Sequence, residues 1–198
     1  MKSVLISIQP KWAEKIASGE KTIEVRKSAP QEVPFKAYIY CTKEKKQDDI
    51  IWAGVCGDRG KWNGRVIGEF VCDKVDEYNF HNGLTEFNSM GLPSRIYGSY
   101  LIFADDYKSM CLSYDEVKNY GKGKTLYGWH ISDLKIYDKP RELSDFYREC
   151  EKPCKPNKGK ILCITTKSLK MNGCNGKIPL TRAPQSWQYI EELQEGKK

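Results

Sequence analysis

The stretch SGEKTIEVRK near the start of the chain brings four polar residues close together: Lys21, Thr22, Glu24 and Arg26. Lys21 precedes a segment in which polar and apolar residues alternate, as they do in a half-buried β-strand. Because successive side chains of a strand point to opposite faces, Thr22, Glu24 and Arg26 share one face. Such a face is either solvated, with an ion pair of little energetic value, or it lines a polar pocket. The pattern leaves both interpretations open.

Glu69 is a second chemical candidate, because it lies in a predicted strand, residues 66–73, whose two faces are both mostly apolar. A buried carboxylate requires a partner or a water-lined pocket. Lys21 and Arg26 are the candidates for that partner. A buried carboxylate beside a lysine is also an arrangement that tunes an acid or a base for proton transfer.

Four of the eight cysteines fall in one lysine-rich segment with little periodicity, from about residue 149 to residue 177. Four thiols in such a segment are a candidate tetrahedral zinc site, and the nearby lysines would favour thiolates. Only one pair is closely spaced, so free thiols are the alternative. We expect no required cofactor, and a structural zinc ion would be held by Cys150, Cys154, Cys163 and Cys174.

The elements that position these residues are short strands and a few short helices. Helices are predicted from Pro10 to the glycine at position 19 and after the capping-box pattern Ser113-x-x-Glu116. Strands are predicted at 4–8, 21–26, 35–42, 50–56, 66–73, 125–138 (one strand or a pair) and 186–192. Without regular βαβ alternation, this order predicts an α+β fold with a partly closed barrel.

The bulk composition indicates a globular chain, with 39% hydrophobic and 30% charged residues among 198. Because there is neither a signal peptide nor an apolar run of about 18 residues, we expect a cytoplasmic protein without a membrane partner. The net charge of +7 is compatible with a polyanionic partner but does not require one. We expect a monomer with a single domain, residues 1–198, into which the segment at about 149–177 is inserted.

The stretch ISIQPKWAEKIASGEKTIEVRK resembles the ASCH family, small RNA-associated domains of the PUA-like superfamily, through the signature G-x-K-x-x-E-x-R. The stretches PFKAYIYCT, LYGWHISDL and LTRAPQSWQYIEEL resemble the longer ASCH proteins that are common in phages and gut bacteria. The resemblance covers most of the chain except residues 150–177. It implies an open β-barrel with short flanking helices and a cleft beneath the G-x-K motif.

The resemblance implies two functions for that cleft. Related domains bind RNA or modified bases there, and one small branch is an amidohydrolase that deacetylates N4-acetylcytidine with a lysine, a threonine and a glutamate. By motif, the lysine corresponds to Lys21 and the glutamate to Glu69, while Glu24 stands in the place of the threonine. A glutamate cannot form the ester of a hydroxyl nucleophile, so Glu24 would have to activate a water. Thr22 is on the same face, but about 6–7 Å along the strand.

Binding fits these residues more easily than catalysis. Glu24 can accept a hydrogen bond from the amino group of cytosine, and Arg26 can hold a phosphate or a carbonyl edge. Three tryptophans are candidates for stacking on a base, although a core position is favoured for any single one of them: Trp12, Trp129 and Trp187.

Arg182 and Gln185, in the stretch RAPQSW, are secondary binding candidates. The alternative is that this stretch is a simple turn before the last predicted strand.

The main prediction is an ASCH domain that binds RNA or a modified nucleotide in a cleft formed by Lys21, Glu24, Arg26 and Glu69. The first alternative is an amidohydrolase acting on an N4-acylated cytidine, with Lys21 as the base and Glu24 or Glu69 handling the proton or the water. The second is a protein-interaction module of phage origin, whose vestigial pocket is filled by side chains.

Overall fold

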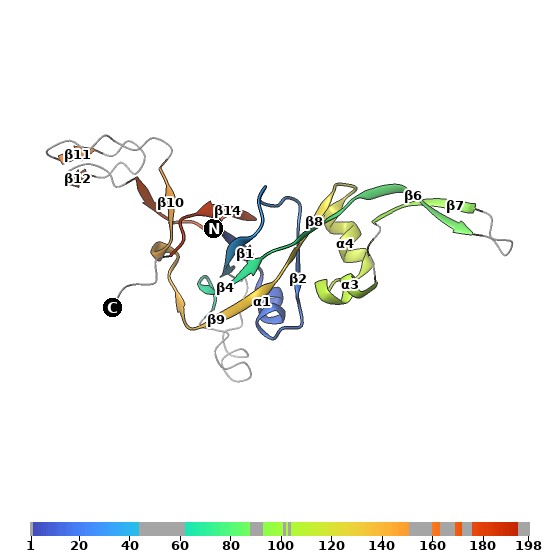
Figure 1. The fold of residues 1–198 in the computed structure, drawn as a ribbon, viewed down its shortest axis with the longest axis horizontal. Coiled ribbons are helices and arrows are strands. Elements are labelled where there is room, and N and C mark those ends of the chain that lie inside the picture. The colour runs from blue at the N-terminus through green and yellow to red at the C-terminus, as the bar shows by residue number, and fades with distance from the viewer. Residues whose placement is uncertain are drawn as a thin grey trace. The chain divides into compact units, whose positions relative to one another are not determined.

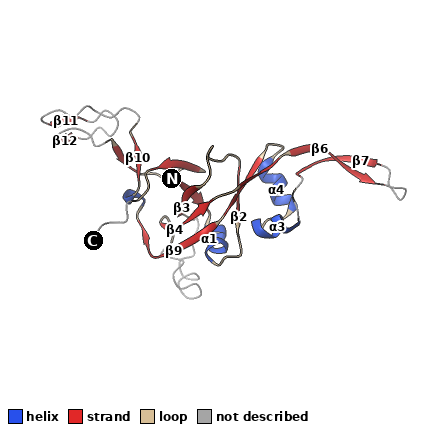
Figure 2. Cartoon of the chain, in the orientation of Figure 1, coloured by secondary structure: helices blue, strands red, loops and turns tan. Residues whose placement is uncertain are grey.

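The computed structural model describes residues 2–43, 62–87, 93–100, 102, 104–150, 160–162, 169–171 and 176–193 (Figure 1). Short strands and short helices alternate irregularly along the chain, which confirms the α+β prediction (Figure 2). Within the described residues the strands form open sheets, none of which closes on itself. None of the helices found there is long and apolar enough to cross a membrane.

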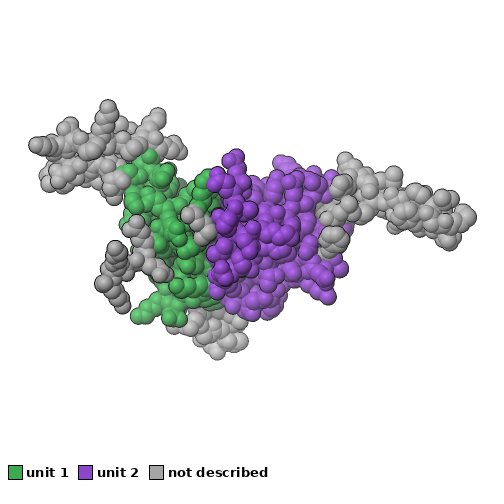
Figure 3. Space-filling model, viewed as in Figure 1, with its two compact units in different colours: residues 1–10, 36–69, 135–198 green, residues 11–35, 70–134 purple. Residues whose placement is uncertain are grey.

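The chain divides into two compact units, each of which is assembled from separate stretches of sequence (Figure 3). Unit 1 comprises Met1–Pro10, Lys36–Glu69 and Lys135–Lys198. Unit 2 comprises Lys11–Phe35 and Phe70–Leu134.

A five-stranded sheet, built mainly from residues of unit 1, organises the first unit. Its strands, in their order across the sheet, are β14 (Trp187–Ile190), β1 (Lys2–Ile8), β3 (Phe35–Cys41), β4 (Val66–Cys72) and β9 (Ser132–Arg141). The other described elements of unit 1 are a 3₁₀ turn and two small antiparallel pairs: η2 (Leu143–Asp145), β10 (Tyr147–Glu149) with β13 (Lys177–Pro179), and β11 (Lys160–Leu162) with β12 (Leu169–Met171).

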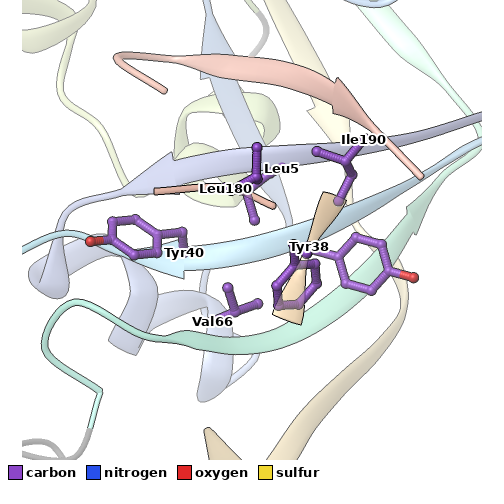
Figure 4. Close-up of a cluster of buried hydrophobic side chains, with 7 residues drawn as sticks. Leu5, Tyr38, Tyr40, Val66, Leu180 and Ile190 are labelled. Carbon is purple, nitrogen blue, oxygen red and sulfur yellow. The ribbon is translucent and has the colours of Figure 1, made fainter. Parts of the chain in front are cut away.

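The core of unit 1 forms because alternate residues of these strands are apolar and point to one side (Figure 4). The ring of Tyr38 meets that of Phe146 edge to face, with 5.1 Å between the centroids. Its hydroxyl accepts a hydrogen bond from the backbone N–H of Leu193 at 3.1 Å, which satisfies a polar group that would otherwise be costly to bury. The buried members of this core are Leu5, Tyr38, Tyr40, Val66, Phe146, Leu180 and Ile190.

A three-stranded antiparallel sheet organises unit 2, in the order β2 (Ile23–Arg26), β8 (Leu126–His130), β5 (Val75–Tyr78). The unit also contains the hairpin of β6 (Phe80–Phe87) and β7 (Pro93–Tyr100) and three helices: α1 (Pro10–Ala17), α3 (Ala104–Met110) and α4 (Tyr114–Gly121). Residues of the sheet and of α3 and α4 form its core: Ile23, Val25, Tyr78, Met110, Val117 and Leu126.

The helix signals in the sequence are confirmed. Gly19 has a φ of +78° two residues after α1, the left-handed conformation that ends helices. At the start of α4 the backbone N–H of Glu116 donates to the Ser113 hydroxyl at 3.2 Å, and the N–H of Ser113 donates back to the Glu116 carboxylate at 2.8 Å. This reciprocal capping box stabilises the first turn of a helix that has only eight residues.

Most of the predicted strands form near their predicted bounds, and the segment 125–138 is a strand pair, β8 and β9. The strand predicted at 50–56 lies outside the described residues. Helix α3 and the β6–β7 hairpin were not predicted from the sequence.

Candidate functional site

Strand β2 separates its apolar from its charged side chains. Ile23 and Val25 belong to the core of unit 2. Glu24 and Arg26 alternate with them and therefore point to the opposite face of the sheet. Thr22 lies before the strand, and its side chain is exposed.

The charged side chains on this face contact one another and are almost completely buried. The exposed fractions are 2% for Lys21, 6% for Glu24 and 8% for Arg26. One oxygen of the Glu24 carboxylate lies 3.4 Å from Lys21 Nζ, and the other lies 3.0 Å from a terminal nitrogen of Arg26. We call these residues the Lys21–Glu24–Arg26 cluster. Of the two interpretations of the sequence, the solvated face is therefore wrong.

The electrostatics of the cluster follow from this geometry. Isolated charges are very costly to bury, so each cation needs the carboxylate between them. Lys21 Nζ also donates a hydrogen bond to the carbonyl oxygen of Met110, at 2.5 Å. Two cations and one carboxylate leave a net positive charge, which favours an anionic ligand group.

Trp12, on α1, is the predicted aromatic residue that lies beside the cluster. Its ring centroid is 5.3 Å from Lys21 Nζ and 4.3 Å from the Nζ of Lys11, within the range of cation–π contacts. The Trp12 side chain is only partly buried.

Two residues of helix α4, Glu116 and Tyr120, lie near the cluster. Neither was predicted as a site residue. Burial raises the pKa of Tyr120, and two cluster charges also act on it, Arg26 lowering the pKa and Glu24 raising it. The Nζ of Lys27 lies 4.9 Å from the Tyr120 ring centroid.

Glu116 lies four residues before Tyr120, on the same side of α4. Its pKa is lowered by the hydrogen bonds from Ser113, first of all from the backbone N–H, and by the charges of Lys11 and Lys21. A spacing of four between a carboxylate and an aromatic ring behind a capping box is visible in the sequence. This spacing places Glu116 and Tyr120 on one side of the helix, and it is the signal by which the sequence could have indicated them as a pair.

The structure pairs Glu69 with residues other than those expected. Tyr137 donates a hydrogen bond to the Glu69 carboxylate at 2.5 Å, and Lys36 Nζ lies 3.6 Å from it. The expectation that Lys21 or Arg26 is the partner is wrong, because those two cations hold Glu24. The physical reason is strand order: β4 lies between β3, which carries Lys36, and β9, which carries Tyr137.

Trp129 is a core residue, the alternative that the sequence analysis left open. Its side chain has an exposed fraction of 0% and packs edge to face with Phe35, with 5.0 Å between the ring centroids. Trp187 lies in unit 1, at the start of β14, where its ring meets that of Tyr189 at 5.3 Å. Trp129 is also paired with Glu24 across β2 and β8, but it is buried, whereas the Trp12 side chain beside the cluster is partly exposed.

Arg182 and Gln185 are both exposed and belong to unit 1. Their segment is tied to strand β1, because Ser7 Oγ donates to the carbonyl of Pro184 at 2.6 Å and the Ser7 N–H donates to the carbonyl of Ser186 at 2.9 Å. Hydrogen bonds of this kind are expected when the segment is a turn held against its neighbouring strand, which was the alternative to ligand binding.

Of the four cysteines of the candidate zinc site, only Cys150 lies within the described residues, where its side chain is buried. Cys154, Cys163 and Cys174 lie outside the described residues. In the described part of the chain no three potential ligands from His, Cys, Asp and Glu come together. Zinc binding stays a prediction.

Comparison with known proteins identifies the family. A model of the ASCH domain matches residues 6–140. A crystal structure of ASCH from Zymomonas mobilis is 20% identical over 72% of this chain and 74% of that chain, with a TM-score of 0.44. A serine-to-alanine mutant of the same protein is 16% identical over 96% of this chain and 89% of that chain, with a TM-score of 0.51, which is a likeness of fold.

The search of curated proteins found no match. The family match spans more than half of the 198 residues and includes the whole Lys21–Glu24–Arg26 cluster. The chain belongs to the ASCH domain family, with its PUA-like α+β fold.

Proposed function

We propose that the chain binds RNA or a modified nucleotide at the Lys21–Glu24–Arg26 cluster. The observation that carries this proposal is the burial of two cations that both pair with one carboxylate, beside a partly exposed tryptophan. Perturbed or costly charge placement concentrates at functional sites. The family membership adds support, because ASCH domains resemble RNA-associated PUA-like domains.

Each side chain of the cluster has a role in such binding. Arg26 presents a planar guanidinium that can hold a phosphate or a base carbonyl, and Lys21 adds a compact positive charge. Glu24 can accept a hydrogen bond from an exocyclic amino group. The partly exposed ring of Trp12 offers a stacking surface for a base, which does not depend strongly on base identity.

The test compares two substitutions that remove the same charge from different places. Lys21→Met takes the ammonium out of the cluster, and Lys108→Met takes one from the exposed surface of α3. We expect Lys21→Met to weaken binding of a short single-stranded RNA by about tenfold or more, because a desolvated charge contact is lost. Lys108→Met should change affinity less than about twofold. Fluorescence anisotropy with labelled RNA, alongside thermal melting of each variant, provides the measurement.

An equal loss of affinity in both variants would show that binding follows net charge alone and not the cluster. Absence of RNA binding by the wild-type protein, together with absence of binding to N4-acetylcytidine, would remove the proposed function altogether.

The second candidate function is hydrolysis of an N4-acylated cytidine. The contact of Lys21 with Glu24 in a nearly dry environment favours it, because such a pair can move a proton to or from a water. In this reaction water oxygen bonds to the acyl carbon, the C–N amide bond breaks, and the leaving nitrogen takes a proton. Glu69 has no place in it, since it is held by Tyr137 and Lys36.

Chromatographic detection of cytidine from N4-acetylcytidine tests the second function. A rate that disappears in Lys21→Met and in Glu24→Gln, but not in Lys108→Met, is the expected result for an enzyme. No release of cytidine above the rate in buffer excludes this reaction for this substrate.

A further inference from the structure

Unit 2 contains an open pocket that neither the family motif nor the proposed function includes. Its volume is about 350 Å³, and it is lined by the segment 27–31, which follows strand β2, together with Val75, Glu77 and Tyr127. Small-ligand sites in proteins have volumes of about 300–1,000 Å³. The pocket is therefore large enough for one nucleoside and too small for several.

The pocket and the cluster lie on one face of the same three-stranded sheet. Arg26 on β2 is paired with Tyr127 on β8, which is paired in turn with Glu77 on β5. Directly paired residues of antiparallel strands point to the same face. This row therefore begins in the cluster and ends in the wall of the pocket.

The next row of the sheet repeats this arrangement. Glu24 is paired with Trp129, which is paired with Val75, another residue that lines the pocket. Trp129, in the middle of this row, is fully buried. The other face of the sheet is occupied by the core of unit 2, through Ile23, Val25 and Tyr78.

The separation suits two neighbouring groups of one ligand. Adjacent strands lie about 4.8 Å apart, so Arg26 and Glu77 are separated by about 10 Å across β8. Lys27 connects the two places, because it lines the pocket while its Nζ lies 4.9 Å from the ring of Tyr120, next to the cluster.

The side chains of the pocket match the parts of a nucleotide. Lys27 offers a positive charge for a phosphate. The partly buried ring of Tyr127 offers apolar surface for the face of a base, and Gln31 and Glu77 carry the acceptors and donors that read a base edge. Gln31, Glu77 and Lys27 are all exposed and so are accessible to a ligand.

We infer that this pocket holds a second nucleotide of the same ligand whose first nucleotide lies at the cluster, an inference that rests on the proposed function. The ligand is then an oligonucleotide of at least two residues, and a single nucleotide occupies only part of the site. The segment 27–31, with Tyr127, determines how much the second nucleotide adds to affinity.

The experiment compares a pool of RNA trinucleotides with a pool of nucleoside 5′-monophosphates, both titrated into the full-length protein by calorimetry. We expect the wild-type protein to bind the trinucleotides about tenfold or more tightly than the monophosphates. Gln31→Ala and Tyr127→Leu should each reduce that advantage by about fivefold or more, because a base contact or a stacking surface is lost. Both variants should bind monophosphates as the wild type does.

Glu32→Ala is the matched control, because Glu32 is exposed beside Gln31 but does not line the pocket. It should keep the trinucleotide advantage. Gln31 is exposed, so Gln31→Ala decides the outcome if Tyr127→Leu does not fold.

Two results would overturn the inference, and they differ in what they say about the cluster. Monophosphate binding without any trinucleotide advantage, or an advantage that survives Gln31→Ala, leaves the proposed function intact and removes the second subsite. Absence of binding by both pools removes the proposed function and the subsite together.

Discussion

At the scale of single residues, Glu24 is the centre of the candidate site, because it is the only negative charge between two buried cations of the cluster. Losing one member of a buried ion pair leaves the other uncompensated, which usually costs about 3–5 kcal/mol. The carboxylate at this position therefore has a structural reason to be present whether or not it contacts a ligand. Substitution of Glu24 alone cannot separate the two roles, and every test above therefore includes a substitution of another residue.

Asp76 gives unit 2 a dependence on acid. Its carboxylate lies 2.6 Å from His130 Nε2 and accepts a hydrogen bond from Lys74 Nζ at 3.0 Å. Burial by itself would raise the pKa of Asp76, but the bonds from His130 and Lys74 outweigh it and hold this pKa below the ordinary value of 3.8. A carboxyl group whose pKa is depressed by folding stabilises the fold above its unfolded pKa, and this stability is lost as the pH falls through the folded value.

We therefore expect Asp76→Asn to lower the free energy of unfolding by about 1 kcal/mol near neutral pH. The difference from the wild type should shrink as the pH falls below the ordinary carboxyl pKa of 3.8 and vanish once Asp76 is protonated in the folded protein. Urea denaturation at a series of pH values provides the measurement. Asp73→Asn, which removes a carboxylate from an exposed position nearby, is the matched control. A difference that is the same at every pH would contradict the assignment.

The residue scale also shows what the sequence could predict about the site. Alternation along one strand was enough to place Glu24 and Arg26 together, because neighbours in sequence depend only on local geometry. Glu69 was placed wrongly, since its partner depends on which strands flank β4, and spacing along the chain carries no such information.

At the scale of elements, the sheet of unit 2 depends on a close approach at Gly128 in β8. A Cβ at this position would lie 2.7 Å from the Tyr78 ring and 3.0 Å from a side-chain carbon of Ile23. Both neighbours belong to the core of the unit, so neither can move freely. The missing side chain allows the strands to pack against Tyr78.

Gly128→Ala should therefore lower the free energy of unfolding by about 1–3 kcal/mol, the usual cost of overpacking a core. Chemical denaturation followed by tryptophan fluorescence measures this cost, because Trp129 is the next residue. Gly19→Ala is an informative comparison: a Cβ there has no neighbour within 4 Å, so its cost comes from the positive φ alone. If Gly128→Ala proved as stable as the wild type, the packing described for β8 would be incorrect.

Elements with strong local signals were predictable, and those stabilised mainly by packing were not. Helix α4 carries a capping box, and α1 lies between a proline and a left-handed glycine. By contrast, α3 has the sequence ADDYKSM, which has too few apolar residues to show a helical period. Its buried residue, Met110, joins the core of unit 2, and this tertiary contact is not visible in the sequence.

At the scale of the whole molecule, the proposed binding of RNA by a chain with a net charge of +7 predicts a dependence of affinity on salt. Each phosphate contact on a single strand contributes a slope of about −0.7 to the plot of log affinity against log salt concentration. We expect Lys27→Ala to make that slope less steep by about 0.7, because Lys27 lines the pocket and is exposed.

Anisotropy titrations with single-stranded RNA over a several-fold range of salt concentration measure this change. Lys108→Ala, which removes an equally exposed positive charge from α3, should leave the slope unchanged. Equal slopes for the wild type and Lys27→Ala would show that Lys27 does not contact phosphate.

The family and the α+β class were predictable for the whole molecule, because the short motif G-x-K-x-x-E-x-R indicated the family and the order of strands and helices indicated the fold class. The division into two units was not predicted, since each unit is assembled from separate stretches of the chain. The pocket was also not predicted, because its walls come from the segment after β2 and from β5 and β8, which are brought together only by strand pairing.

The hydrogen bond from Lys21 Nζ to the carbonyl of Met110 joins the cluster to the last residue of α3. The preceding carbonyl, that of Ser109, accepts from the backbone N–H of Thr22 at 2.9 Å. The end of α3 is thus held by the same two residues that introduce the charged strand. A ligand that draws the Lys21 ammonium toward itself loosens this helix terminus, and by thermodynamic reciprocity the order of the terminus modulates affinity by the same factor. Ligand binding at the cluster should therefore change the rate of amide hydrogen exchange along α3.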